Sequence, residues 1–224
     1  MSTTYLLLFA GGMNANYCYV RYQRDLQRLA NTLTLLAGTG VLSTSILHGD
    51  GGLKFNILSS SVGSLPATRV NLKQAFARMA TLLTASDRFI FVASNHGGPS
   101  STGARLWCWD EEFVDNSEFL EWCKPIESAM QVYVFGQCYA GGFLPVAALN
   151  RLVLTACGPL EVSYATSDLQ NDEFILRICE AIEGGASNWS EVFTHAMAND
   201  TMSEHPQISS IGAIAADSLF LVRK

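Results

Sequence analysis

The sequence predicts an α/β fold in which a mainly parallel sheet is covered by helices on both faces, and three observations support it. Short runs rich in Val, Ile, Leu and Phe alternate with longer segments of helical periodicity. The apolar runs lack strict polar alternation, which is typical of strands buried on both sides. At 224 residues, with 49% apolar and 15% charged residues, the chain suits one compact domain over residues 1–224.

The individual elements follow from these patterns. Apolar runs bounded by Gly, Asp or Ser predict strands at residues 5–10, 41–47, 88–94, 131–136 and 151–157, and a last strand near 218–224. Helical periodicity predicts helices at residues 19–38, 68–86, 116–124, 172–184 and 187–200. A small hairpin is expected over 103–113. The sequence has no internal repeats, and it has no linker-like stretch that would suggest a second domain.

Composition narrows the function classes. The net charge of −6 and the lack of any Lys/Arg cluster argue against nucleic acid or an anionic membrane as a partner, and leave small molecules or polypeptides. The first apolar run is too short for a membrane helix and has no basic segment before it. Six cysteines without zinc-like spacing predict reduced thiols in a cytoplasmic protein, with no metal and no cofactor.

Two predicted strands end in reactive side chains. The strand in FIFVASNHGG releases His96, and the strand in VFGQCYAGGF releases Cys138. The carboxyl ends of parallel strands share one edge of the sheet, where catalytic groups commonly gather. If the two strands are neighbours, the imidazole and the thiol face one cleft.

A Cys-His pair suffices for acyl transfer, because the imidazole helps to form a thiolate that attacks a carbonyl carbon. The adjacent glycines let the backbone approach closely, so the N–H groups of Gly97 and Cys138 are candidate donors to an oxyanion. His48 also follows a strand and precedes glycine, so it is a second candidate base. His195 lies in a predicted helix and His205 in a polar loop, where structural or solvated roles are expected.

The order of strand, His-Gly, strand and Gln-Cys resembles the cysteine peptidases of the caspase, legumain and gingipain clan. Legumain is the broader match: YLLLFAGGMNANYCYVRYQRDLQRLANTL resembles its opening strand and helix, ASNHGG its histidine block, and LVLTACGPLEVSYATSDLQNDEF its pocket loop. The resemblance covers most of residues 5–180. It implies a caspase-like three-layer sandwich with a sheet of about six strands, and an endopeptidase that acts on polypeptides.

The resemblance also implies roles for single residues. His96 would be the base or acid and Cys138 the nucleophile, with the Gly97 and Cys138 amides as the oxyanion hole. Arg21, Ser163 and Asp172 would line the specificity pocket. A pocket with fixed donors and fixed acceptors ranks asparagine first before the cleaved bond, a basic residue second and aspartate third.

The chain departs from the legumain pattern at four places. Gly136 stands where legumain has an acid two residues before the cysteine, and Tyr22 stands where it has a pocket histidine. The third catalytic residue, an asparagine in legumain, falls on Tyr19, with Asn16 as a substitute if the turn is longer. Asn95 takes the place of an aspartate. The machinery is therefore predicted to be a His-Cys dyad.

Two other functions fit some of the same residues. A cysteine-dependent α/β-hydrolase resembling dienelactone hydrolase would need an acid and a histidine after Cys138, such as Asp168 with His195. The glycines and proline that follow Cys138 make a poor start for the long helix of that fold. The second alternative is an inactive peptidase-like binding module. A short connection from Cys138 to the next strand predicts an unprocessed enzyme, or one that a regulatory protein partner controls.

Overall fold

The structure is a computed structural model that describes residues 3–37, 41–58 and 60–211. A six-stranded sheet lies at its centre in the order β11-β10-β9-β5-β1-β2, and its neighbouring strands are parallel except β10 and β11. The strands are β1 (Thr3–Ala10), β2 (Val41–His48), β5 (Arg88–Ala93), β9 (Met130–Phe135), β10 (Arg151–Thr155) and β11 (Gln207–Ile208). The carboxyl ends of β1, β5, β9 and β10 therefore lie side by side.

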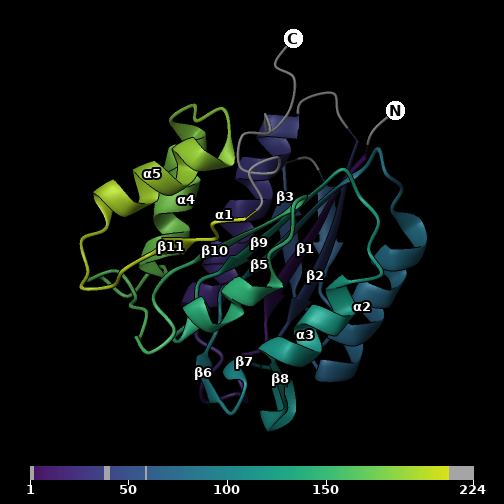
Figure 1. Cartoon of the computed structure of the whole chain (residues 1–224). Helices are drawn as coiled ribbons and strands as arrows, with labels where there is room; N and C mark the ends of the chain where they lie inside the picture. Colours follow the sequence, from purple (N-terminus) through teal and green to yellow (C-terminus); the bar gives the residue numbers. More distant parts are fainter. Residues whose placement is uncertain (1–2, 38–40, 59, 212–224) are drawn as a thin grey trace.

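Helices cover both faces of this sheet (Figure 1). One face packs against α1 (Val20–Ala37), α4 (Glu173–Glu183) and α5 (Trp189–Asn199), and the other against α2 (Arg69–Leu82) and α3 (Asn116–Cys123). Successive side chains of a strand point to opposite faces, so Leu6 and Leu8 join the first core while Leu7 and Phe9 join the second. Burial on both sides explains why the strands read as continuous apolar runs.

Two smaller sheets flank the main one. The first is the hairpin of β3 (Lys54–Ile57) and β4 (Ser60–Gly63). The second is a three-stranded sheet of β6 (Gly97–Ser100), β7 (Gly103–Trp107) and β8 (Phe113–Asp115), with a 3₁₀ turn, η1 (Trp109–Glu111), between its last two strands. It lies at the carboxyl-end edge of the main sheet (Figure 1), and β6 begins directly after His96.

The predicted class, α/β with a mainly parallel sheet and helices on both faces, is confirmed. The five predicted helices form close to their expected bounds, and the predicted hairpin over 103–113 belongs to the β6-β7-β8 sheet. The β3-β4 hairpin was not predicted, because its strands are short and mostly polar. The strand predicted near 218–224 lies outside the described residues, and β11 is the antiparallel strand beside β10.

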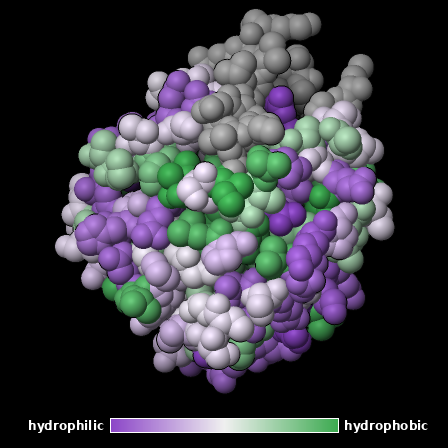
Figure 2. Space-filling view, viewed as in Figure 1, coloured by the Kyte–Doolittle hydropathy of each residue, from purple (hydrophilic) through white to green (hydrophobic). Residues whose placement is uncertain are grey.

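The outer surface of the helices is largely polar. Figure 2 shows a mostly hydrophilic surface where α2 lies in Figure 1, which agrees with a helix that buries Leu72, Phe76 and Met79 and turns its other side outward. Within the described ranges, no helix combines the length and apolar character that crossing a membrane requires.

Candidate active site

The two reactive side chains predicted from the sequence leave neighbouring strands at the same level. β5 pairs with β9 in parallel, and Ala93 at the end of one strand is in register with Phe135 at the end of the other. His96 and Cys138 follow these paired residues at corresponding positions along the chain. The strand order therefore brings the imidazole-bearing turn and the thiol-bearing turn together.

Gly97 fixes how closely the two turns approach. A Cβ atom at this position would overlap the carbonyl oxygen of Cys138, and it would also crowd the side chain of Gln137, 2.8 Å away. Only glycine, which has no Cβ, allows the backbone after His96 to lie directly against the backbone of Cys138. This contact joins the two halves of the candidate dyad.

The His96 ring is anchored through one nitrogen. Its Nε2 lies 3.1 Å from the backbone carbonyl oxygen of Tyr17. A carbonyl oxygen only accepts, so Nε2 carries the proton and donates it. The neutral ring therefore keeps Nδ1 as an acceptor. The anchor comes from the turn before α1. Among the described residues, no hydrogen bond joins the His96 ring to the side chain of Asn16 or Tyr19, the two positions considered for the catalytic asparagine of legumain.

Aromatic rings surround the imidazole. Tyr17, Tyr19 and Tyr22 each meet His96 edge to face, with ring centroids 6.0, 5.1 and 5.5 Å away. Burial among these rings, together with the nearby positive charge of Arg21, lowers the pKa of His96 below its ordinary value. The ring is therefore held in its neutral form, which a general base requires.

The Cys138 sulfur is half-buried beneath the segment that includes Ser163. The Ser163 N–H donates to Sγ at 3.4 Å, and its hydroxyl approaches the same sulfur at 3.8 Å. The next residue, Tyr139, adopts a left-handed conformation with φ 59°, and its N–H donates to the carbonyl of Glu161 at 2.7 Å. This bond ties the cysteine turn to the segment that covers the sulfur.

Two backbone N–H groups in the His96 and Cys138 turns are candidate donors to an anion. The His96 carbonyl accepts from Trp107 N–H at 3.2 Å, so His96 and Trp107 form a hydrogen-bonded antiparallel pair. Hydrogen-bonded and non-hydrogen-bonded pairs alternate, so the Gly97 N–H points away from β7. Within the described part of the chain, the Cys138 N–H also has no hydrogen-bond partner.

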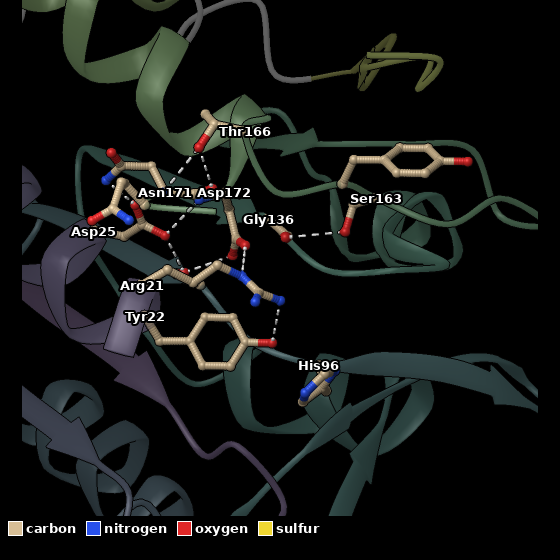
Figure 3. A network of polar contacts seen from close by, with 12 residues as sticks. Arg21, Tyr22, Asp25, His96, Gly136, Ser163, Thr166, Asn171 and Asp172 are labelled. Carbon is tan, nitrogen blue, oxygen red and sulfur yellow. Dashed lines mark hydrogen bonds and ion pairs between the residues drawn. The ribbon is translucent and has the colours of Figure 1, made fainter. Parts of the chain in front are cut away.

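The three pocket residues predicted from the sequence lie around this centre, and two of them form an ion pair (Figure 3). Arg21 Nε lies 2.8 Å from Asp172 Oδ1, and the side chains are 18% and 7% exposed. Arg21 Nη2 donates to the Tyr22 hydroxyl at 3.3 Å, while Nη1 has no partner among the described residues. The Ser163 hydroxyl donates to the Gly136 carbonyl at 3.3 Å.

Packing explains the missing acid at position 136. A Cβ on Gly136 would lie 2.7 Å from the side chain of Ile175 in α4 and 3.2 Å from the Ala93 carbonyl. Ile175 therefore occupies the place that a larger side chain at this position would need. Tyr22 stands where legumain has a pocket histidine. Its ring lies against Arg21, with the guanidinium carbon 4.8 Å from the ring centre.

Other residues singled out from the sequence lie elsewhere. Asn95 is buried, accepts from Gly12 N–H at 2.7 Å and donates to the Trp107 carbonyl, so it joins β1 to β7. His48 ends β2, three strands from β9, a separation of roughly 14 Å at ordinary strand spacing. Asp168 is held by Thr166 and Gln170, with no contact to His195 on α5.

Sequence reasoning missed several groups that the structure adds to the site. Tyr17 acts through its backbone, which its side-chain identity does not reveal. Asp25 and Ser94 lie behind Asp172 and contact it, the first from α1 and the second at the end of β5. A polar residue at the buried end of a strand was the available signal for Ser94. Among the residues described, no cluster of three or more His, Cys, Asp or Glu is arranged to hold a metal ion.

Comparison with solved structures shows the fold. The chain is similar to protein GSU0716 from Geobacter sulfurreducens, with a TM-score of 0.68 at 13% identity over 100% of both chains. It is also similar to the Drosophila initiator caspase Dronc, with a TM-score of 0.68 at 11% identity over 97% of this chain and 82% of the other. Caspase-1 from Spodoptera frugiperda has a TM-score of 0.64 at 12% identity over 99% and 87%.

These likenesses show that the chain has a caspase-like α/β sandwich, as expected. No family model matches the sequence, and no curated protein matches it.

Proposed function

We propose that the protein is a cysteine endopeptidase that uses His96 and Cys138 to cleave peptide bonds after a polar residue. The observation that carries this proposal is the packing of Gly97 against Cys138, which holds an anchored imidazole and a thiol on neighbouring strand ends. The caspase-like fold supports it.

The proposed reaction is acyl transfer to sulfur. His96 Nδ1 takes the thiol proton, and the sulfur attacks the scissile carbonyl carbon. The developing oxyanion is bound by the Gly97 and Cys138 N–H groups, a contribution of about 3–4 kcal/mol per donor in comparable sites. His96 then returns the proton to the leaving amine as the C–N bond breaks, and water hydrolyses the thioester. The Tyr17 carbonyl keeps the ring oriented throughout.

The pocket favours asparagine before the scissile bond. Arg21 offers a free Nη1 donor, and the Ser163 hydroxyl, which donates to the Gly136 carbonyl, keeps lone pairs that accept, so an amide side chain finds both. Both Asp172 oxygens are already engaged, one by Arg21 and one by Ser94. A basic side chain would have to displace these bonds. We therefore rank aspartate second and a basic residue third, which reverses the order expected from the sequence for these two.

The hydrolase alternative finds less support. An α/β-hydrolase elbow leads into a long helix, whereas Cys138 is followed by the short 3₁₀ segment η2 (Ala140–Val146), which leads to β10. Asp168 and His195 make no contact with each other. The fold comparison also points to the caspases.

The decisive experiment is a positional-scanning peptide library on the wild type and on Cys138→Ala, followed by three matched peptides with Asn, Asp or Arg before the scissile bond. We expect cleavage by the wild type in the order Asn, Asp, Arg, and none by the variant. Strict cleavage after arginine would contradict the pocket assignment. If no peptide is cleaved and an acyloxymethyl-ketone probe labels no thiol selectively, the protein is a non-catalytic binding module.

A further inference from the structure

Behind the candidate pocket, one hydroxyl lies between two buried carboxyl groups. Ser94 Oγ is 2.7 Å from Asp25 Oδ2 and 2.8 Å from Asp172 Oδ2. All three side chains are almost inaccessible to solvent, with residue exposures of 0% for Ser94, 1% for Asp25 and 5% for Asp172. Figure 3 shows the two aspartates on the side of Arg21 away from His96.

These two distances require an additional proton. A serine hydroxyl has one hydrogen, so it donates to only one of the two carboxyl oxygens. The other oxygen, at hydrogen-bond distance from the lone pairs of Ser94, makes a favourable contact only if it carries a hydrogen itself. An ionised oxygen there would be repelled in a site without water. One of the two aspartates is therefore a neutral carboxylic acid.

The surrounding contacts assign the proton to Asp25. Asp172 Oδ1 has the Arg21 guanidinium at 2.8 Å, which favours its ionised form. In the part of the chain that the structure describes, no cation pairs with Asp25, and its donors are neutral: Asn171 Nδ2 at 2.7 Å and the Asp172 N–H at 3.0 Å. Burial raises the pKa of both carboxyls, and the Arg21 charge opposes the rise at Asp172.

Other ionisable groups around the pair do not change this assignment. They come from each element packed against it: Arg21 and Tyr22 on α1, Cys179 on α4, and Glu204 after α5. Burial raises the pKa of Tyr22, Cys179 and Glu204, so all three are expected to be largely neutral near pH 7. Arg21 is then the cation that acts on the pair.

We propose that Asp25 is a positioning residue of the pocket: a neutral acid that donates to Ser94, which in turn donates to Asp172 and so fixes the Arg21 side chain. The proposal rests on the proposed function, because it explains how the donor that meets the substrate side chain is oriented. With Asp25 neutral, the buried group holds one negative charge against one positive charge. The pocket is then suited to an uncharged amide such as asparagine.

The proton itself is tested without any activity measurement. In protein labelled with ¹³C at the aspartate carboxyl carbons, the NMR signal lost in Asp25→Asn should have the shift of a protonated acid at pH 6.5. The signal lost in Asp172→Asn should have that of a carboxylate. Two ionised signals, or a protonated Asp172 beside an ionised Asp25, would overturn the proposal.

The positioning role is tested by kinetics on the asparagine peptide. Asp25→Ala should raise KM about tenfold and change kcat less than about threefold, the pattern of lost substrate binding. Asp25→Asn keeps a donor for Ser94 but loses the acceptor of the Asp172 N–H, so its KM should lie between those of the wild type and Asp25→Ala. Asp87→Asn is the matched control, since Asp87 is a buried acid at the opposite end of β5 whose bonds go to Thr3 and Thr84.

Asp87→Asn should lower thermal stability and leave KM unchanged. An unchanged KM in a folded Asp25→Ala would overturn the positioning role, as would a rise in KM of the same size in Asp87→Asn. If Asp25→Ala does not fold, the single variant Ser94→Ala takes its place. It should raise KM as Asp25→Ala would, and it is compared with the single variant Asp25→Asn in the same way. A wild-type protein that cleaves no peptide would defeat the proposed function alone, and the carboxyl NMR signals would still decide whether Asp25 holds the proton.

Discussion

Among the described residues, two pairs of cysteine and histidine lie at the carboxyl-end edge of the sheet, and their surroundings differ. In one pair, Cys18 Sγ lies 3.9 Å from His48 Nε2. In the other, Cys138 and His96 leave the neighbouring strands β9 and β5. Both thiols are half-buried. His48, His96 and Cys138 each have a glycine within three residues, whereas the glycine nearest to Cys18 in the sequence is Gly12, six residues before it.

Their surroundings do separate them. Burial, with a contribution from Asp50, raises the pKa of Cys18 to about 11, and burial lowers the pKa of His48. The first pair is therefore a neutral thiol beside a neutral ring. The second has an imidazole anchored on a carbonyl, a sulfur that accepts from Ser163, and candidate oxyanion donors in the N–H groups of Gly97 and Cys138. The proposed function therefore rests on the groups around Cys138 and His96, and not on a direct contact between a thiol and an imidazole.

The largest expected effect is on catalysis. His96→Ala should lower kcat/KM by about 10² to 10⁴-fold, because a general base in this position contributes about that much. Cys138→Ala should abolish cleavage. The matched variants His48→Ala and Cys18→Ala should stay within about threefold of the wild type in kcat/KM on the asparagine peptide. Full activity of His96→Ala, or a loss confined to His48→Ala, would reverse the comparison.

The next effect comes from the glycine that joins the dyad. Gly97→Ala would place a methyl group against the Cys138 carbonyl, so the turns must separate. We expect the free energy of unfolding to fall by about 1–3 kcal/mol, with most activity lost. Gly98→Ala is the control, because its new Cβ would find its nearest neighbour, Trp107 Nε1, at 3.5 Å. Equal denaturation midpoints and equal activities for the two variants would show that the turns do not touch as described.

The third prediction concerns thiol labelling. A pKa of about 11 leaves Cys18 almost without thiolate at neutral pH, and thiolate is the form that alkylates. Iodoacetamide at pH 6 should therefore modify Cys138 first, and mass spectrometry after limited labelling would identify the site. Labelling of Cys18 ahead of Cys138 would show that the first pair is the activated one.

The smallest effect is a displaced pH dependence. Burial and the Arg21 charge lower the pKa of His96, so the ring stays neutral at a pH where an exposed histidine is already protonated. As pH falls through the lowered pKa, the base is lost. The acid limb of kcat/KM for a neutral peptide should therefore lie below about pH 6.5, the ordinary value for histidine. An acid limb above that pH would contradict the burial of the ring.

The fold was predictable because its main signals are local. Strands buried on both faces leave long apolar runs, and the helices α1 to α5 leave their own periodicity. The β3-β4 hairpin was missed because each strand has only four residues: KFNI alternates over too short a span, and SSVG has a single large apolar residue. Asp172 shows the limit of local signals. It stands at the N-cap position of α4, where aspartate commonly caps, yet its side chain makes no cap bond and turns to Arg21 and Ser94.

The approach of the His96 and Cys138 turns was predictable, because both follow apolar strands and carry glycines. The candidate site was not predictable where the contribution comes from a contact distant in sequence. Asp25 and Ser94 meet only because α1 packs beside the end of β5. The exclusion of a side chain at Gly136 depends on Ile175, which approaches from α4. Neither relation leaves a pattern along the chain.

The anchor of His96 also determines which substitutions the proposed site should tolerate. Because a main-chain oxygen at position 17 holds the ring, replacing the tyrosine with another residue does not remove the acceptor. In a saturation library, substitutions of Tyr17 should be far more permissive than substitutions of His96. Substitutions should be tolerated less well in the turn that orients this carbonyl. There the Tyr17 and Cys18 N–H groups both donate to the Asn14 backbone oxygen, at 3.1 and 2.9 Å. Divergent relatives would then be expected to keep the backbone conformation of this turn while the identities of its residues change.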